Sequence, residues 1–346
     1  MLPENIIVST DPAADLSKAI ATLQPSKIAV LVDQNTRANC YPVISDSLPA
    51  HTLIEIIAGE EEKHLGSCQK IWEAMTEEAF DRKALLVNLG GGVIGDMGGF
   101  CAASYKRGIH FINLPTTLLS QVDASVGGKL GIDFQGYKNH IGFFQEPNSV
   151  IIWPGFLKTL PQREVRSGFA EVIKHCLIAD GSYWDMVSSK GLDGQPWQEI
   201  IPRSVGTKYK VVQEDPTEKG LRKILNFGHT IGHAVESFFL DRGDNRLFHG
   251  EAIAIGMIAE GYLSVKKTGL AEADFKVFAQ YIREVYDDYA IDTADIRAIA
   301  QLSLQDKKNS GGTINASLLD GLGSCAYDIP ITLQEIEEAL RYYLKK

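Results

Sequence analysis

ALLVNLGGGVIGDMGGF, residues 84–100, joins an apolar run typical of a buried strand to a helical pattern of small residues. Gly90, Gly92 and Gly95 have the spacing GxGxxG, in which glycines let backbone N–H groups approach a pyrophosphate at a helix N-terminus. A tight strand-to-helix turn without any ligand has the same glycines. The acidic residue that dinucleotide-binding folds place about 20 residues downstream is missing, because Pro115 stands there. The stretch therefore predicts a nucleotide-binding turn that differs from the standard dehydrogenase pattern.

Similar apolar runs surround this stretch in the first half of the chain. They are KIAVLVD (27–33), TLIEIIAG (52–59) and IHFINLP (109–115), and residues 61–80 have apolar positions at helical spacing. Alternating strands and helices predict a parallel sheet covered by helices, with ligands at the carboxyl ends of the strands. Asp33 ends one of these strands and the polar turn 115–125 ends another, so several strand ends can converge on one ligand.

After about residue 155 the pattern changes to long helical segments without strands between them. These segments are FAEVIKHCLIA (169–179), EIIPRSVGTKYKVVQED (199–215), HTIGHAVESFFL (229–240), HGEAIAIGMIAEGYLSVKKTG (249–269) and TLQEIEEALRYYL (332–344). We therefore predict an α/β, Rossmann-like nucleotide-binding domain over residues 1–155 and a mainly α-helical domain over residues 156–346. The boundary is expected near WPGFLKTLP (153–161).

Composition limits the functions open to the chain. Of its 346 residues, 45% are hydrophobic and 23% are charged, which is typical of a globular protein, and the formal net charge of −10 argues against a nucleic-acid partner. No apolar run approaches the roughly 18 to 20 residues of a membrane helix, and the N-terminus lacks a secretory signal pattern. Five scattered cysteines without a CxxC pair predict reduced thiols and a cytoplasmic protein.

Two histidines in LNFGHTIGHAVE (225–236) indicate a metal site. His229 and His233 are four residues apart, so both imidazoles project from one helix face. The spacing resembles the HExxH of zinc proteases, but Thr230 occupies the position of the catalytic glutamate. The pair therefore needs other partners if it binds a metal.

Five residues compete for the ligand positions of such a site, namely Glu171, His175, His229, His233 and His249. Two imidazoles and one carboxylate, with a position left for substrate, form a catalytic zinc set. Each candidate alone is explained as well by an ordinary polar role; Glu171 and Lys174, for example, have the spacing of a surface ion pair. The histidines together with Asn226, among glycines and small residues, favour a site.

Basic residues recur beside the same polar and glycine-rich turns, although scattered lysines usually mark a solvated face. They are Arg107, Lys129, Lys138, Lys208, Arg222, Lys307 and Lys308. In an acidic chain, such a set is suited to a phosphorylated or carboxylated small substrate.

At this point the sequence resembles a known family. GGGVIGDMGGF, RGIHFINLPTTLLSQVDASVGGKLGID, GYKNHIGFFQEP, LKTLPQREVRSGFAEVIKH, GLRKILNFGHTIGHAVE and HGEAIAIGM are similar, in this order, to blocks of the 3-dehydroquinate synthases. These enzymes are sugar-phosphate cyclases of the shikimate pathway of aromatic amino acid biosynthesis. The likeness runs from residue 31 to residue 309 and departs at no chemistry-bearing position.

The resemblance implies NAD and one divalent metal ion, zinc or cobalt, as cofactors. The metal ligands would be Glu171, His229 and His249, with His233 in the substrate pocket and His175 behind the ligands. The implied NAD contacts are Asp33, Asn35, Glu60, Lys63, Gly91, Gly92, Val93, Asp96, Thr116, Thr117, Leu119, Asp123, Ser125, Lys138, Phe156, Thr159, Leu160 and Glu164.

The resemblance also implies the residues that handle the substrate. The catalytic set would be Lys129, Lys174, Lys208, Asn226 and His233, and the substrate-binding set Arg107, Asp123, Lys138, Asn139, Arg222 and one of Lys307 or Lys308. Arg107 would reach the site of a neighbouring subunit, which implies a homodimer.

The implied reaction converts 3-deoxy-D-arabino-heptulosonate 7-phosphate into 3-dehydroquinate and phosphate. It would proceed by transient oxidation with NAD, β-elimination of phosphate, reduction and an intramolecular aldol closure. Three alternatives stand beside it: a sister cyclase for another sugar phosphate, such as a 2-deoxy-scyllo-inosose synthase, a metal-dependent polyol dehydrogenase, and a non-catalytic nucleotide-binding protein. The segment VDASVGGKLGID argues against the first, and the combined metal and basic sets argue against the other two.

Overall fold

A computed structural model describes residues 2–135, 137–240, 242–287, 289, 291–305 and 314–345. The chain divides into two compact units, Met1–Pro161 and Gln162–Lys346. The division falls at the end of the stretch 153–161, near which the boundary was expected, and Phe156 is buried in the core of the first unit. Lys307 and Lys308, two of the predicted substrate residues, lie outside the described residues.

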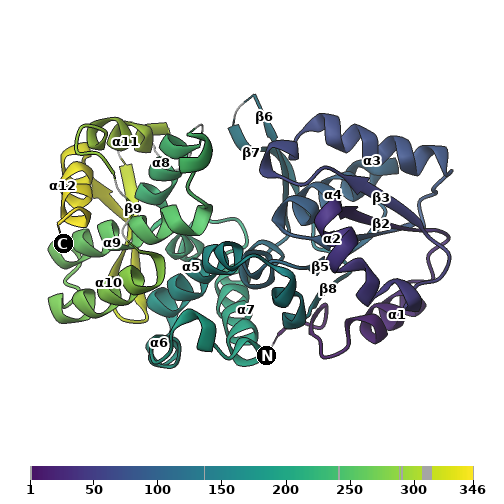
Figure 1. Ribbon diagram of the computed structural model, residues 1–346, viewed down its shortest axis with the longest axis horizontal. Helices are drawn as coiled ribbons and strands as arrows, with labels where there is room; N and C mark the ends of the chain where they lie inside the picture. The colour runs from purple at the N-terminus through teal and green to yellow at the C-terminus, as the bar shows by residue number, and fades with distance from the viewer. Residues whose placement is uncertain are drawn as a thin grey trace. The chain divides into compact units, whose positions relative to one another are not determined.

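A six-stranded sheet forms the centre of the first unit (Figure 1). Its strands are β1 (Ile6–Val8), β2 (Ile28–Asp33), β3 (Thr52–Ile56), β4 (Leu85–Gly90), β5 (His110–Pro115) and β8 (Ser149–Ile152). Their order is β1-β8-β5-β4-β2-β3, and every neighbouring pair is parallel. The four strands expected from the sequence are confirmed, and β1 and β8 add to them.

Both faces of this sheet are buried, as expected for a parallel sheet. Ala29 and Leu31 of β2 pack into one hydrophobic cluster, whereas the alternate residues Val30 and Val32 pack into a second one. Helices cover both clusters. Those of the first unit are α1 (Pro12–Leu23), α2 (Gln34–Asn39), α3 (Leu65–Glu77) and α4 (Gly92–Ser104). The continuous apolar runs of the sequence are therefore explained by burial on two sides.

Shorter elements complete the first unit. They are the helical turns η1 (Tyr41–Val43), η2 (Ser45–Ser47), η3 (Glu60–Glu62), η4 (Tyr105–Arg107), the π-turn η5 (Ser120–Ala124) and η6 (Pro154–Thr159), with an antiparallel hairpin of β6 (Lys129–Phe134) and β7 (Tyr137–Phe144).

The strand order creates a switch point between β2 and β4. From β2 the chain crosses to β3 on one side and then returns to β4 on the other side. Ligands of open α/β sheets bind in the crevice at the carboxyl ends of the strands where the order reverses. At this edge β2 ends in Asp33 and β4 ends in the turn Gly90–Gly92. The topology thus places the expected nucleotide turn at the expected position.

The second unit is mostly helical, as predicted. Its helices are α5 (Gln162–Ala179), α6 (Gly181–Ser188), α7 (Trp197–Glu214), α8 (His229–Phe239), α9 (His249–Lys267), α10 (Glu272–Tyr286), α11 (Ile296–Leu302) and α12 (Leu333–Tyr343). Short turns are η7 (Leu192–Gly194), η8 (Leu221–Asn226), η9 (Gly243–Asn245) and η10 (Ser303–Gln305). Helix α9 contacts α5, α8, α10 and α12, so it is the central helix of this unit.

The expectation that this half contains no strands was wrong near its C-terminus. The antiparallel strands β9 (Ile314–Gly321) and β10 (Ser324–Ile331) pair around a turn at Gly323, whose φ of 83° favours glycine. Strand β9 packs on α9, and Ile314, Ala316 and Leu318 are buried. The alternation of apolar and polar residues in this short segment was not recognised between the helical patterns on either side of it.

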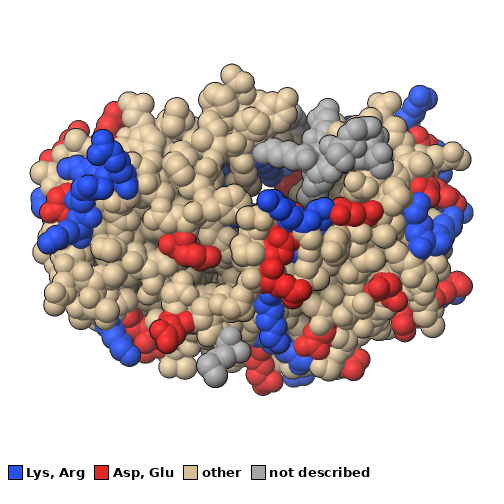
Figure 2. All heavy atoms as spheres, turned by 180° about the vertical axis from the view of Figure 1, so that it is seen from behind, with Lys and Arg blue, Asp and Glu red and all other residues tan. Residues whose placement is uncertain are grey.

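The cysteines, the helices and the surface charges agree with the composition. All five cysteines are free thiols. Among the described residues, no helix is both long and apolar enough to cross a membrane. On the face drawn in Figure 2, basic side chains are interspersed with acidic ones and do not form one continuous basic field.

Candidate active site

The glycine-rich turn of the first unit brings two strand ends together. Gly91 is the N-cap of α4 and has no side chain that could occupy the helix N-terminus. A Cβ on Gly91 would lie 3.0 Å from Thr117 Cγ2, and the Thr116 amide donates to the Gly90 carbonyl at 3.0 Å. The ends of β4 and β5 therefore meet at the first turn of α4.

A hollow opens beside this turn. It is lined by Gly92, Gly95, Asp96, Asn113, Ala124, Ser125, Gly128, Lys129, Leu130 and Pro147. A Cβ on Gly95 would meet nothing within 4 Å, so this glycine faces open space. Backbone N–H groups at a helix start, beside a space that side chains do not fill, are suited to a dinucleotide pyrophosphate. The residues present therefore fit the implied cofactor.

Several predicted cofactor residues form a charged cluster near the same helix. The buried Lys63 ammonium lies 2.7 Å from Asp96 Oδ2 and 2.7 Å from Asn139 Oδ1. Lys138 Nζ lies 3.8 Å from Glu60 Oε1. Burial lowers the pKa of Lys63, but the Asp96 and Glu60 carboxylates outweigh it, so the pKa is raised and the ammonium stays charged.

Other predicted contacts of the first unit are more scattered. Asp33 Oδ1 accepts from the Thr36 amide at 2.8 Å and caps α2, which also carries the exposed Asn35. Val93 lies in the first turn of α4, Leu119 precedes η5, Asp123 lies in η5, and Phe156, Thr159 and Leu160 lie in or beside η6. Glu164 lies in α5 of the second unit. The NAD contacts of these residues remain predictions.

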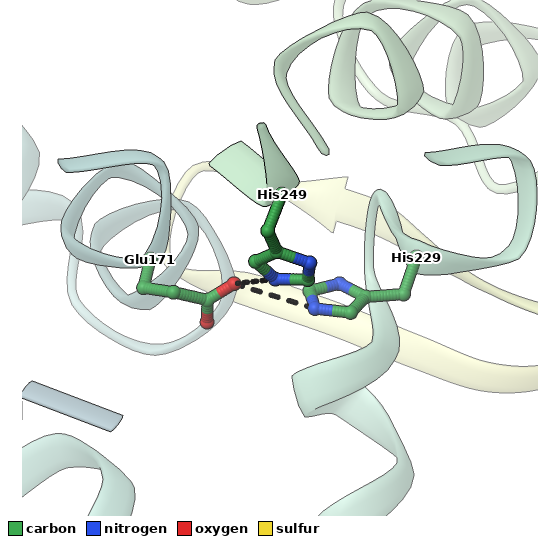
Figure 3. Close-up of side chains that lie close together, drawn as sticks. All are labelled: Glu171, His229 and His249. Carbon is green, nitrogen blue, oxygen red and sulfur yellow. Dashed lines mark ion pairs between the residues drawn. The ribbon is translucent and has the colours of Figure 1, made fainter. Parts of the chain in front are cut away.

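In the second unit, Glu171, His229 and His249 converge on one point (Figure 3). Glu171 Oε1 lies 3.3 Å from His229 Nε2 and 3.5 Å from His249 Nε2. The ligand atoms of the three residues lie within 4.8 Å of one another. Glu171 comes from the middle of α5, whereas the histidines are the first residues of α8 and α9.

The second nitrogen of each imidazole is bound by an acceptor. His229 Nδ1 lies 3.1 Å from the Phe227 carbonyl, and His249 Nδ1 lies 3.1 Å from Glu236 Oε2. These acceptors hold the Nδ1 protons, so Nε2 is the nitrogen of each imidazole that would bind a metal ion, as in carboxylate–histidine–metal arrangements. Two nitrogens and one carboxylate oxygen, with one position open, match a catalytic zinc set, so the residues fit the implied metal.

The charges around this point shift the pKa of each of the three residues. The pKa of Glu171 is well below its usual range, because the Lys174 ammonium and the imidazole contacts outweigh burial. Burial lowers the pKa of His249, but the Glu236 and Glu171 carboxylates raise it to about 10 in the metal-free protein. Burial and the charge of Lys174 lower the pKa of His229. A cation among these groups would replace the proton on His249.

The two remaining histidine candidates lie beside or behind this set. The His233 ring centroid is 5.0 Å from that of His229 and 6.0 Å from that of His249. His233, Glu236 and His249 form a second possible metal group, but His249 Nδ1 is there already bonded to Glu236. His175 Nδ1 lies 2.6 Å from Ser204 Oγ, behind the ligands on α5. The geometry thus favours the set of Glu171, His229 and His249.

Several of the predicted basic site residues are buried. Among the described residues, the buried lysines and arginines are Lys63, Lys174, Lys208 and Arg222, all of them predicted site residues. Lys174 forms an ion pair with Glu171 Oε2. Because long basic side chains are rarely buried, this concentration requires anionic partners. Elements α5, α7 and η8, which carry the last three, pack against one another.

Two acidic residues of this region were missed by the sequence analysis. Glu236 holds His249, and it was detectable as the residue seven positions after His229, on the same helix face. Glu218 Oε1 accepts from the predicted site residue Asn226 at 2.9 Å. Its φ of 60° is unusual for a residue other than glycine, and no sequence signal indicated it.

Comparisons with known proteins show the family of the chain. The N-terminal domain family of 3-dehydroquinate synthase matches residues 53–167, and the C-terminal domain family matches residues 168–309. A 3-dehydroquinate synthase of Parabacteroides distasonis is 40% identical over 350 residues, which cover 99% of this chain and 98% of that protein.

Solved structures show the same fold. The 2-epi-5-epi-valiolone synthase of Streptomyces hygroscopicus subsp. jinggangensis 5008, with NAD+ and Zn2+ bound, has a TM-score of 0.88 and 26% identity and covers 100% of this chain and 98% of its own. A 2-deoxy-scyllo-inosose synthase with NAD+ and Co2+ has a TM-score of 0.85 and 24% identity over 97% of this chain and 96% of its own. With both domain families matched in order, the chain belongs to the 3-dehydroquinate synthase family.

Proposed function

We propose that this protein converts 3-deoxy-D-arabino-heptulosonate 7-phosphate into 3-dehydroquinate and phosphate, with NAD and a divalent metal ion. The observation that carries the proposal is the convergence of Glu171 Oε1 with the two Nε2 atoms of His229 and His249. The identity to named 3-dehydroquinate synthases over nearly the whole chain supports this substrate over that of a sister cyclase.

The cofactors would be held by different kinds of group. The turn Gly90–Gly92 and the start of α4 would bind the dinucleotide, and Glu171, His229 and His249 would bind the metal ion. When bound, the nicotinamide supplies a reversible hydride acceptor and the metal ion supplies a Lewis acid. The structure of a relative with NAD+ and Zn2+ supports this pairing.

The residues of the chain would bind and orient an anionic substrate. Lys208 and Arg222 are buried cations suited to the phosphate or carboxylate of a sugar acid, and the fixed fork of Arg222 favours a bidentate contact. Lys174 lies against Glu171 Oε2, where an ammonium also stabilises a developing alkoxide. His233, beside the metal ligands, can hold or move a proton at a substrate hydroxyl.

A homodimer is part of the proposal. Arg107 is exposed, and both it and Lys106 have positive φ values, of 69° and 50°, which is unusual outside glycine and common at functional positions. The hairpin of β6 and β7 exposes Tyr137, Phe143 and Phe144, an apolar surface that a second subunit could cover. The five free thiols support a reducing compartment, the cytoplasm.

One assay tests the activity. The protein is supplied with the heptulosonate phosphate, catalytic NAD and zinc, and phosphate release is followed with and without a chelator. We expect phosphate release that the chelator abolishes, without lasting NADH. Lasting NADH without phosphate release would point to a polyol dehydrogenase, and turnover of sedoheptulose 7-phosphate instead would point to a sister cyclase.

A further inference from the structure

Glu260 is a fully buried carboxylate on α9, eleven residues after His249, and its partners lie on a different helix. Its Oε2 accepts from the Gly228 amide at 2.7 Å, and its Oε1 accepts from the Ile231 amide at 2.8 Å. Gly228 is the N-cap of α8 and Ile231 lies in its first turn. Both carboxylate oxygens of Glu260 therefore cap the helix that begins with His229.

The close approach of α8 and α9 explains why a distant residue provides this cap. Gly228 has a φ of 80°, and a Cβ on it would lie 2.6 Å from Met257 Cγ. A Cβ on Gly256 would lie 1.9 Å from the Gly228 carbonyl oxygen. Glycine is thus required at the N-cap of α8, where Ser, Thr, Asp or Asn usually provides the capping oxygen. Glu260 takes over that role.

The charge of Glu260 suits this position. A helix N-terminus carries a partial positive charge and unsatisfied N–H groups, which stabilise an anion. A buried carboxylate without such donors would be strongly unfavourable. Replacement of one oxygen by an amide group would set an N–H donor against a backbone N–H, so the cap depends on both oxygens.

We infer that Glu260 is a positioning residue for the metal site, an inference that rests on the proposed function. His229 is the first residue of α8, and its Nε2 lies 3.3 Å from Glu171 Oε1. A shift of the first turn of α8 moves this nitrogen directly. Helix α9 therefore contributes twice: it supplies His249 at its start, and through Glu260 it holds the other imidazole in place.

The test compares two isosteric changes at helix caps of the same unit. Glu260→Gln disturbs the start of α8, whereas Asp180→Asn disturbs the start of α6, which Asp180 caps through the Tyr183 amide at 3.1 Å. Zinc affinity of each full-length variant is measured by chelator competition, and the absorption spectrum of the Co2+-loaded protein reports the ligand geometry. Metal-free Tm is measured in parallel.

We expect Glu260→Gln to weaken zinc binding about tenfold or more and to change the Co2+ spectrum, in line with residues behind metal ligands. Asp180→Asn should lower Tm and leave both metal readouts as in the wild type. A zinc affinity of Glu260→Gln within twofold of the wild type, with an unchanged Co2+ spectrum, overturns the inference. Failure of the wild type to bind zinc would instead refute the proposed metal site.

If Glu260→Gln does not fold, Glu260→Asp is tested in its place. Aspartate keeps the charge but is one methylene shorter, so it can reach only one of the two amides. The same loss of zinc affinity is expected, and an affinity within twofold of the wild type again contradicts the positioning role.

Discussion

The two units present their ligands in opposite ways. The first unit offers backbone: a turn of glycines at the carboxyl end of β4, beside a hollow that side chains leave open. The second unit offers side chains, namely a buried carboxylate and two imidazoles. The second nitrogen of each imidazole lies against a further acceptor. Ligand binding in the first unit therefore depends on glycines that have no side chain, whereas ligand binding in the second unit depends on specific charges and hydrogen bonds.

This difference predicts different responses to substitution. An added methyl group should damage the first site, whereas an isosteric change of a single carboxylate should damage the second. The same reasoning separates substitutions that affect ligand binding from those that affect only folding, because some glycines face the hollow and others face the packed sheet.

The largest expected effect is that of Glu171→Gln. The change keeps the shape of the side chain but removes the anionic ligand that both Nε2 atoms face. Loss of the metal removes several kcal/mol of transition-state stabilisation, so the rate of phosphate release should fall about a thousandfold or more. Glu338→Gln, at an exposed partner of Lys266, is the matched control and should keep wild-type activity. Normal zinc content in the Glu171 variant would refute its role as a ligand.

Glu236→Gln should have a smaller effect on the same site. The amide oxygen can still accept from His249 Nδ1, so the tautomer is preserved while the charge behind the imidazole is lost. We expect zinc affinity to fall about tenfold, measured by chelator competition at neutral pH. An affinity equal to that of the wild type would mean that Glu236 has no influence on the metal.

Gly95→Ala and Gly98→Ala form a matched pair on α4 that tests the first unit. A Cβ on Gly98 would lie 2.1 Å from Asn88 Oδ1, so this variant should lose about 1 to 3 kcal/mol of stability. A Cβ on Gly95 meets open space, and the helix should gain up to about 1 kcal/mol from the alanine.

The same Gly95→Ala variant should bind NAD about tenfold more weakly, because its methyl group points toward the space the dinucleotide would fill. Thermal unfolding measures the stability of both variants, and titration with NAD measures affinity. Unchanged NAD affinity in Gly95→Ala would place the dinucleotide away from this helix face.

The sequence predicted what is periodic or local. Four strands of the sheet, the long helices and the glycine turn follow from apolar spacing. The strands β1 and β8 are too short to show a clear apolar pattern. The strands β9 and β10 lie between long helical patterns and were not recognised as strands. For the metal site, the sequence supplied five candidate ligands, and only the resemblance to the 3-dehydroquinate synthases selected three of them. The structure brings these three residues, Glu171, His229 and His249, together.

Apart from Glu236, the supporting residues of the site were not predictable, because tertiary packing sets them. Glu260 is 32 positions from Gly228 in the chain and reaches it only because two helices approach at glycines. Lys63 likewise bonds to Asp96, which is 33 positions later in the chain, and to Asn139, which is 76 positions later. Ligand types can be read from a sequence, whereas the groups that orient them depend on the fold.

The smallest expected effect is that of Asp180→Asn, at the N-cap of α6. Asp180 caps α6 through the Tyr183 amide and pairs with Arg203 at 2.7 Å, and its carboxylate is about one-third exposed. The amide oxygen of asparagine can still cap α6, so the main loss is the ion pair with Arg203. Because solvent screens part of that pair, the free energy of unfolding should fall by about 1 kcal/mol or less. Denaturant unfolding at neutral pH measures this difference.

The pH dependence of that difference has a definite sign. Burial raises the pKa of Asp180, but hydrogen bonds from Arg203 and Ser182 outweigh it, so the pKa in the folded protein lies below that of an ordinary aspartate. The stabilisation is therefore fully present above the unfolded-state pKa and is lost as pH falls through the folded-state pKa. The difference in free energy of unfolding between the wild type and Asp180→Asn should stay constant near neutral pH and disappear in acid. A gap that persists at low pH would show that the carboxylate charge contributes nothing, and that packing alone carries the effect.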